Sequence, residues 1–95
     1  MNIPGRNTAV LSAVIVEDSP TQALSIRQRV QRCGFTTRLA NNGAEALKLI
    51  AQDIPTLVLT DLEMPVMDGL ELVQELNRQY PGLPVLLMTA QSDFI

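Results

Sequence analysis

The sequence predicts an α/β fold in which helices wind on both sides of a parallel sheet. Short, apolar, β-branched runs alternate with stretches whose apolar residues recur at helical spacing. The apolar runs contain few polar residues, which is typical of strands covered on both faces. Because the connections between the runs are short, right-handed parallel crossovers are the expected solution.

Length and composition restrict the function classes. A chain of 95 residues forms one small domain with a narrow stability margin. Because 46% of its residues are hydrophobic but only 3% are aromatic, its core is expected to be aliphatic. Arg27, Arg29 and Arg32 are offset by carboxylates elsewhere, so no strong field for nucleic acid is expected. No apolar run approaches a membrane span, and a cytoplasmic location is the expectation. The single cysteine, Cys33, is expected to pack in the core.

The first half of the chain predicts two strands and two helices. Residues 1–8 are expected to be a flexible lead-in, followed by a strand over 11–16. Ser19 and Pro20 then begin a helix as N-cap and first helical residue, and Gly34 ends it. A strand over 35–40 precedes a helix that Asn42 caps, with Glu45 reaching back to it. The inward residues of the two helices are expected to be Ala23, Ile26, Val30 and Cys33, then Leu47, Ile50 and Ala51.

The second half repeats the pattern. A strand over 56–60 leads to Asp61 at its carboxyl end. Asp68, followed three residues later by Glu71, predicts a capping box and a helix to about Tyr80, with Leu72, Val73 and Leu76 inward. The pair Pro81-Gly82 turns the chain into a fourth strand over 84–88, which ends at Thr89.

Acidic residues end two of the predicted strands. Glu17 and Asp18 follow the first strand and Asp61 follows the third. Ligands of open parallel sheets bind beyond the carboxyl ends of the strands, so these side chains are expected to form one pocket, with Thr89 at the same edge. Crowded carboxylates raise one another's pKa values unless a cation holds them, and oxygen ligands favour Mg²⁺ or Ca²⁺. The pocket therefore suits metal-assisted phosphate chemistry.

Simpler interpretations of these residues are also compatible with the sequence. Asp61 could be an ordinary loop acid. Glu17 and Asp18 could serve only to stabilise the following helix, because negative charge near a helix N-terminus interacts favourably with the helix dipole. Thr89 could be no more than a strand-end hydroxyl, and Asp68 is best explained as a helix cap.

Three motifs together resemble the receiver domain of two-component response regulators. They are Glu17-Asp18, the run Asp-x-x-Met-Pro-x-Met-Asp-Gly that begins at Asp61, and Thr89-Ala90 after an apolar strand. The resemblance covers about residues 11–92. It implies a flavodoxin-like, doubly wound (βα)5 fold, here without its last strand and helices, with four strands in the order 2-1-3-4.

The resemblance also implies a function. Asp61 would be the phosphoacceptor, taking a phosphoryl group from a histidine kinase or a histidine phosphotransfer protein. Mg²⁺ would be the cofactor, bound directly by Asp61 and Asp18, through a water molecule by Glu17, and by the backbone carbonyl of Glu63. The cation would neutralise the phosphoryl oxygens.

The remaining roles implied by the resemblance concern the switch and the lifetime of the phosphoryl group. Thr89 would bond a phosphoryl oxygen after transfer and move its loop inward. Ala90 would leave the pocket open, and Glu63 and Gln91 would influence the access of water to the acyl phosphate.

The chain departs from the family pattern at its end. The family continues through a fifth strand that ends in Lys-Pro, and residues 9–95 are therefore expected to form an incomplete receiver domain. Without that lysine, phosphorylation of the isolated chain is expected to be slow or absent. The uncovered sheet face and the open edge of the last strand predict dimerisation, exchange of elements or partial unfolding.

Two other functions are also compatible with the sequence. A degenerate receiver could bind partner proteins without being phosphorylated. A phosphatase of the haloacid dehalogenase type also uses a strand-end aspartate, but that family has a second Asp two residues later, where this chain has Glu63.

Overall fold

The computed structural model describes residues 10–64 and 66–89. The predicted lead-in over 1–8, and the predicted roles of Ala90 and Gln91, lie outside these residues. The described elements are, in chain order, β1 (Ser12–Val16), α1 (Pro20–Arg32), β2 (Thr36–Ala40), α2 (Gly43–Gln52), β3 (Leu57–Asp61), α3 (Gly69–Gln79) and β4 (Val85–Met88).

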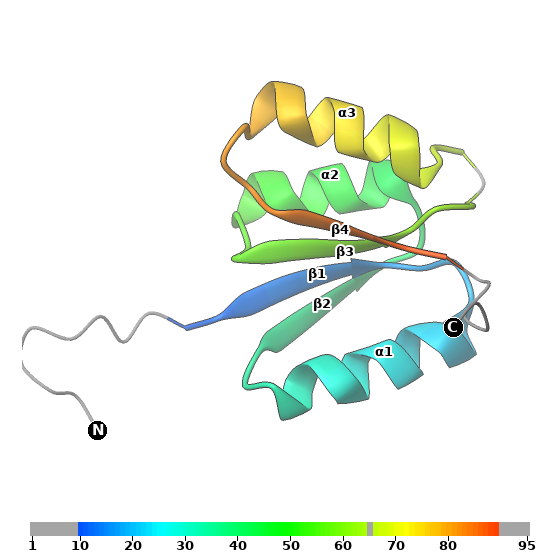
Figure 1. The fold of residues 1–95 in the computed structure, drawn as a ribbon, viewed down its shortest axis with the longest axis vertical. Coiled ribbons are helices and arrows are strands. Elements are labelled where there is room, and N and C mark those ends of the chain that lie inside the picture. The colour runs from blue at the N-terminus through cyan, green and yellow to red at the C-terminus, as the bar shows by residue number, and fades with distance from the viewer. Residues whose placement is uncertain (1–9, 65, 90–95) are drawn as a thin grey trace, which may run out of the picture.

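The strands form one parallel sheet in the order β2-β1-β3-β4. Helices α2 and α3 lie on one face of this sheet and α1 lies on the other (Figure 1). The predicted α/β class, the parallel strands and the strand order are confirmed. All the strands run in the same direction, so their carboxyl ends meet at one edge.

The larger part of the core lies between the sheet and the helices α2 and α3. Val14 and Val16 of β1 and Val58 of β3 are fully buried there, because alternate strand residues point to the same face. The helices contribute their own buried stripes at helical spacing. The members of this cluster are Val14, Val16, Ala40, Ala46, Ile50, Val58, Leu72 and Leu76.

The opposite face of the sheet is covered unevenly. Ile15 is fully buried under α1, and its neighbours across the sheet are Leu59 and then Leu86. Leu59 is half-buried, and Leu86, on the edge strand, is 54% exposed. In the described part of the chain α1 is the only helix on this face, and its cover ends before β4.

The expected core position of Cys33 is wrong. Cys33 is the C-cap of α1 and its side chain is exposed. Of the four residues predicted to face inward from this helix, only Ala23 is buried. Burial requires a neighbouring element as well as helical spacing, and α1 has no second helix beside it in the described residues. Ala51, predicted to be inward on α2, is likewise exposed.

The predicted helix starts are largely confirmed. Ser19 accepts a hydrogen bond from the backbone N–H of Gln22, and Asp68 forms a full capping box with Glu71. Asn42 accepts from the Glu45 backbone N–H at 2.8 Å. The Glu45 carboxylate, however, accepts from the N–H of Asn41 at 2.7 Å rather than from Asn42.

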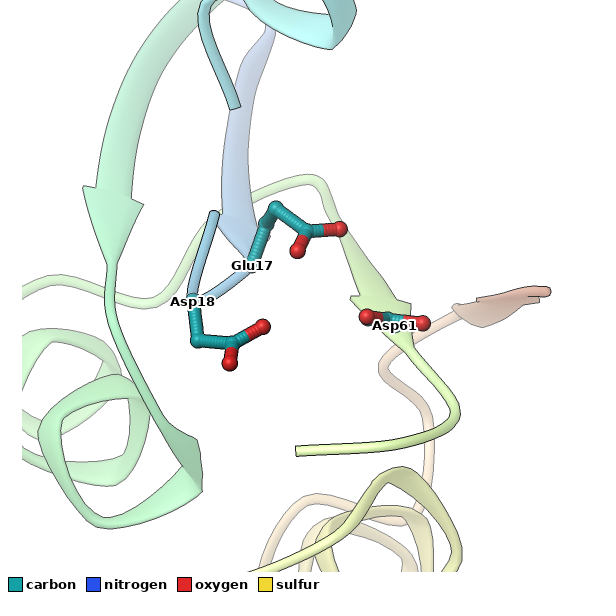
Figure 2. A group of neighbouring side chains, drawn as sticks. All are labelled: Glu17, Asp18 and Asp61. Atoms are coloured by element: carbon teal, nitrogen blue, oxygen red, sulfur yellow. The ribbon is translucent and has the colours of Figure 1, made fainter. Parts of the chain in front are cut away.

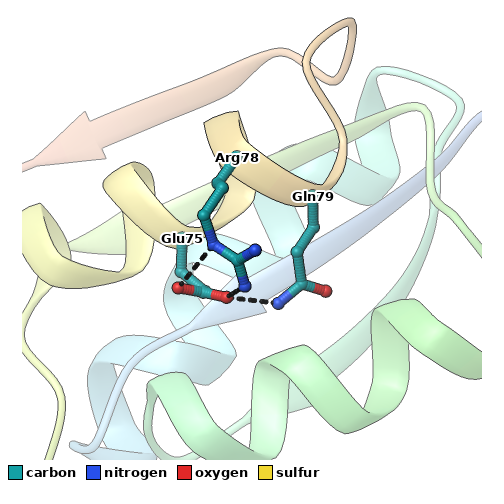
Figure 3. A network of polar contacts seen from close by, with 3 residues as sticks. All are labelled: Glu75, Arg78 and Gln79. Carbon is teal, nitrogen blue, oxygen red and sulfur yellow. Dashed lines mark hydrogen bonds and ion pairs between the residues drawn. The ribbon is translucent and has the colours of Figure 1, made fainter.

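Two polar networks on the surface involve arginines. The Arg38 guanidinium donates to the backbone carbonyls of Leu49, at 2.8 Å, and Asp53, which places a cation at the carboxyl end of α2. On α3, Glu75 accepts hydrogen bonds from Arg78 and Gln79 within about one helical turn (Figure 3). This ion pair is solvent-exposed, so we expect it to add little to stability.

No helix in the described ranges has the length and apolar character needed to span a bilayer.

Candidate metal and phosphate site

The structure brings the three predicted acids together at the carboxyl edge of the sheet. Glu17 directly follows β1, Asp18 is the next residue, and Asp61 is the last residue of β3. One carboxylate oxygen from each lies within 4.8 Å of the others. In Figure 2 the three side chains point into the same space. Neighbouring parallel strands produce this arrangement, because Val16 pairs with Thr60 and both acids follow that pair.

Backbone contacts fix two of the acids. The Ser19 N–H donates to Oε2 of Glu17 at 3.0 Å, and the Glu63 N–H donates to Oδ1 of Asp61 at 3.4 Å. Glu17 and Asp61 are 4% and 6% exposed, whereas Asp18 is exposed to solvent. The group therefore combines two nearly buried carboxylates with one that faces water.

The electrostatics of the group are unfavourable without a cation. Burial raises the pKa of the Glu17 carboxyl, the hydrogen bond from Ser19 lowers it, and the negative charges of Asp61 and Asp18 raise it further. The net direction is upward. A buried carboxyl group with acidic neighbours keeps its proton up to a higher pH than an isolated carboxyl group does.

The donor set fits a hard divalent cation. Carboxylate oxygens are the ligands that Mg²⁺ and Ca²⁺ prefer, and Mg²⁺ commonly binds through one or two carboxylates while keeping several water molecules. The exposed Asp18 leaves room for such water. The described residues of this group offer neither histidine nor cysteine, so softer metals have no preferred ligand here.

A cavity of about 250 Å³ adjoins the acids on the side of α1. Its lining includes Glu17 and Asp61, one face of α1 (the α1 wall), Met88 of β4 and the following Thr89. The remaining lining residues are Gln22, Ser25, Ile26 and Arg29. The cavity thus gives the Asp61 carboxylate a neighbouring space large enough for a phosphoryl group.

The sequence predicted some of these positions and missed others. Asp61, Glu17 and Asp18 meet as predicted, and Thr89 lies on the cavity with Asp61. Glu63 contacts Asp61 through its backbone N–H, while its side chain is exposed. The α1 wall was missed, although residues 22, 25, 26 and 29 follow the spacing i, i+3, i+4 and i+7 of one helix face.

The loop after β3 contains one strained residue. Val66 has a φ of 73° and is 78% exposed. A β-branched residue in this region of backbone conformation is unusual, and such strain is often found near functional sites.

Comparison with known proteins decides the family. The sequence profile of the response regulator receiver domain matches residues 13–94, which is most of the chain. The chain belongs to the response regulator receiver domain family. The acids at the strand ends of this receiver domain all lie within the matched segment.

Two curated relatives show the same similarity in sequence. The receiver domain is 37% identical over 79 residues to the DNA-binding transcriptional regulator NtrC of Escherichia coli strain K12, covering 83% of this chain and 17% of NtrC. It is 37% identical over 78 residues to the response regulator MprA of Mycobacterium ulcerans, covering 82% of this chain and 34% of MprA. The chain therefore spans about a third of MprA and about a sixth of NtrC.

A solved structure agrees with the fold. The response regulator TrrA of Thermotoga maritima, crystallised in complex with Mg²⁺ and BeF, superposes with a TM-score of 0.83 at 30% identity. The match covers 90% of this receiver domain and 74% of the TrrA chain. The four strands and three helices described above are thus those of a receiver fold.

Proposed function

We propose that this receiver domain accepts a phosphoryl group on Asp61 with the help of Mg²⁺ and relays it as a conformational signal. The observation that carries the proposal is the convergence of Glu17, Asp18 and Asp61 within 4.8 Å at the strand ends. Asp61 ends β3 with its carboxylate open to a cavity, which is the position a nucleophile needs. Membership of the receiver family supports the same assignment.

The donor in this proposal is a phosphohistidine of a histidine kinase or histidine phosphotransfer protein. An oxygen of the Asp61 carboxylate forms the new bond to phosphorus as the bond from phosphorus to the histidine nitrogen breaks. The imidazole nitrogen keeps the electron pair and takes a proton from solvent. The product is an acyl phosphate on Asp61.

The residues present fit the cation. Asp18 and Asp61 would hold Mg²⁺ directly, Glu17 would act through a water molecule, and the backbone carbonyl of Glu63 would be a further ligand. When bound, the cation neutralises charge on the phosphoryl oxygens. That TrrA was crystallised with Mg²⁺ and BeF supports this part of the proposal by analogy.

Four further residues belong to the proposal, with roles in the switch and in the lifetime of the acyl phosphate. Thr89, which lies on the cavity with Asp61, would hydrogen-bond a phosphoryl oxygen after transfer. Ala90 would leave the entrance open, and Glu63 and Gln91 would modulate hydrolysis. The expected cytoplasmic location, the absence of a classical enzymatic turnover and the absence of nucleic-acid binding within this chain stay predictions.

Phosphorylation tests the proposal directly. The chain is incubated with Mg²⁺ and acetyl phosphate, and intact mass and peptide mapping follow the added phosphoryl group. We expect one group on Asp61, none in Asp61→Asn, and none when EDTA removes the cation. Asp53→Asn is the matched control, because it removes an acid at an exposed position remote from the cavity lining.

The alternative is a receiver that binds partners without being phosphorylated. One observation favours it: the cavity next to Asp61 has no lysine among its described lining residues. In that case acetyl phosphate and beryllofluoride would leave the amide signals around Asp61 unchanged while Mg²⁺ still moved them. Added mass on Asp61 would exclude this alternative.

A further inference from the structure

One side chain of the β3–α3 loop, residues 62–68, packs against the start of α2. Gly43 is the first residue of α2 and is buried. A Cβ built on Gly43 would lie 2.8 Å from Sδ of Met67 and 2.9 Å from both Cβ and Cγ of Met67. Non-bonded carbon atoms prefer separations of about 3.5 to 4.0 Å. Met67 therefore occupies the space that a side chain at position 43 would need.

Rotation of the Met67 side chain alone could not make room for a methyl group here. Rotation about χ1 moves Cγ and Sδ, but Cβ is fixed to the backbone, so α2 or the loop would have to shift. The start of α2 is held by its cap, since the Asn42 side chain accepts from the Glu45 N–H at 2.8 Å, and by the buried Ala46. Val66, next to Met67, has a φ of 73° and is 78% exposed. The loop is therefore the part that we expect to move.

The same loop contains the backbone that contacts Asp61. The Glu63 N–H donates to Oδ1 of Asp61 at 3.4 Å. The ends of the loop are tied together, because the Gly69 N–H donates to the Leu62 carbonyl at 2.9 Å. A short loop with fixed ends cannot move at Met67 without disturbing its other residues. The contact of Met67 with α2 thus bears on the position of the Glu63 backbone.

We propose that Gly43 is a positioning residue for the acidic group: because it has no side chain, Met67 packs against α2 and the loop holds the Glu63 backbone beside Asp61. The inference concerns Mg²⁺ binding and so rests on the proposed function, in which the Glu63 carbonyl is a ligand. Gly43 is not a member of the acidic group, and it acts on that group through Met67.

Mg²⁺ affinity, measured by calorimetry on folded protein, tests this role. Gly43→Ala is expected to bind Mg²⁺ about ten-fold more weakly, as is typical when a group that orients a metal ligand is changed. A purely structural effect would lower the unfolding midpoint and leave the affinity of the folded chain unchanged. Gly82→Ala is the matched control, because a Cβ there has no neighbour within 4 Å. Its Mg²⁺ affinity should equal that of the unchanged chain.

A second substitution tests whether the effect passes through Met67. Adding Met67→Ala to Gly43→Ala removes two of the three atoms that crowd the new Cβ, so the double variant should recover part of the lost affinity. Met67→Ala alone should weaken Mg²⁺ binding, because the loop loses its contact with α2. Leu83→Ala is its control: both side chains are partly buried against the same core cluster, but Leu83 precedes β4, at the amino ends of the strands.

A metal-free measurement separates this inference from the proposed function. In EDTA, the backbone amide signal of Glu63, which reports the hydrogen bond to Asp61, is compared among the variants by NMR. We expect the signal to move in Gly43→Ala, to return part of the way in the double variant and to stay in Gly82→Ala.

The inference requires all of these results. A folded Gly43→Ala with unchanged Mg²⁺ affinity or an unmoved Glu63 signal, or a double variant no better than Gly43→Ala, overturns it. If Gly43→Ala does not fold, the comparison of Met67→Ala with Leu83→Ala decides by the same two measurements. An unchanged chain that binds no Mg²⁺ refutes the proposed function instead, and the Glu63 signal in EDTA then decides the inference alone.

Discussion

Gly69 lies against the backbone of Asp61. A Cβ built on Gly69 would overlap the Asp61 carbonyl oxygen and would lie 2.9 Å from Cα of Leu62. The Gly69 N–H donates to the Leu62 carbonyl at 2.9 Å, which ties the start of α3 to the end of β3. The residue that begins α3 must therefore be small for Asp61 to keep its position.

This contact predicts that Gly69→Ala is costly. The added methyl group meets backbone atoms, which cannot rotate away, so we expect a loss of about 2 kcal/mol in the free energy of unfolding. Displacement of Asp61 should also weaken Mg²⁺ binding. Gly82→Ala is the control, since a Cβ there has no neighbour within 4 Å. Urea unfolding and Mg²⁺ titration measure both effects, and equal stability of the two variants would contradict the prediction.

Mg²⁺ should stabilise the folded chain through the acidic group. At a concentration ten times the dissociation constant, the expected gain is about 1.4 kcal/mol, because the cation binds only when the three carboxylates are assembled. Asp18→Asn should reduce the gain. Asp53→Asn, which removes an equally charged and exposed residue elsewhere, should retain it. Thermal unfolding with and without Mg²⁺ decides between these outcomes.

Glu17 should make the metal-free chain less stable as the pH rises. Its pKa in the folded chain is raised above the ordinary value of 4.5, so the folded state holds the proton more tightly than the unfolded state. The contribution to the free energy of unfolding therefore falls as the pH rises from 4.5 through the folded pKa. Glu17→Gln should remove this fall and stabilise the metal-free chain at neutral pH. Urea unfolding over a pH series in EDTA measures it; identical profiles would refute it.

Asp68 should be a structural residue rather than a ligand. Its side chain accepts from the Glu71 N–H at 2.9 Å, and it does not belong to the acidic group. Asp68→Ala is expected to cost about 1 kcal/mol in the free energy of unfolding, whereas Asp68→Ser should keep the cap. Mg²⁺ affinity, measured by calorimetry on folded protein, should be the same in both. Weaker Mg²⁺ binding in Asp68→Ser would assign the carboxylate to the metal site instead.

The open edge at β4 predicts self-association of the isolated chain. β4 pairs only with β3 in the described sheet, and it contains no charged residue. Leu86, 54% exposed, extends the apolar row of Ile15 and Leu59 to this edge. Uncharged edge strands invite pairing with another chain, so Leu86→Lys should reduce association.

A matched leucine controls for exposure alone. Leu24 is 52% exposed, almost as much as Leu86, but it belongs to helix α1 and not to the edge strand. Leu24→Lys should leave the sedimentation profile of the chain unchanged. If both lysine variants reduce association equally, general hydrophobicity rather than the strand edge is responsible.

Local sequence signals explain why the helix starts and the acidic group could be predicted. The N-caps Ser19, Asn42 and Asp68 bond to backbone groups three residues later, so their geometry is contained within one short segment. Asp61 follows a buried apolar run, and parallel strands align their carboxyl ends whatever their order. The acidic group thus followed from strand polarity without any knowledge of side-chain contacts.

The amino-acid sequence determined the elements of this receiver domain, their caps and the strand ends at which Glu17 and Asp61 stand, because periodicity and capping act over a few residues. Only the tertiary structure decided what covers each face. Cys33 is exposed and Leu86 half-exposed because burial depends on neighbours distant in the chain. Likewise, residues of α1 line the cavity next to Asp61 only because packing placed this helix beside the strand ends.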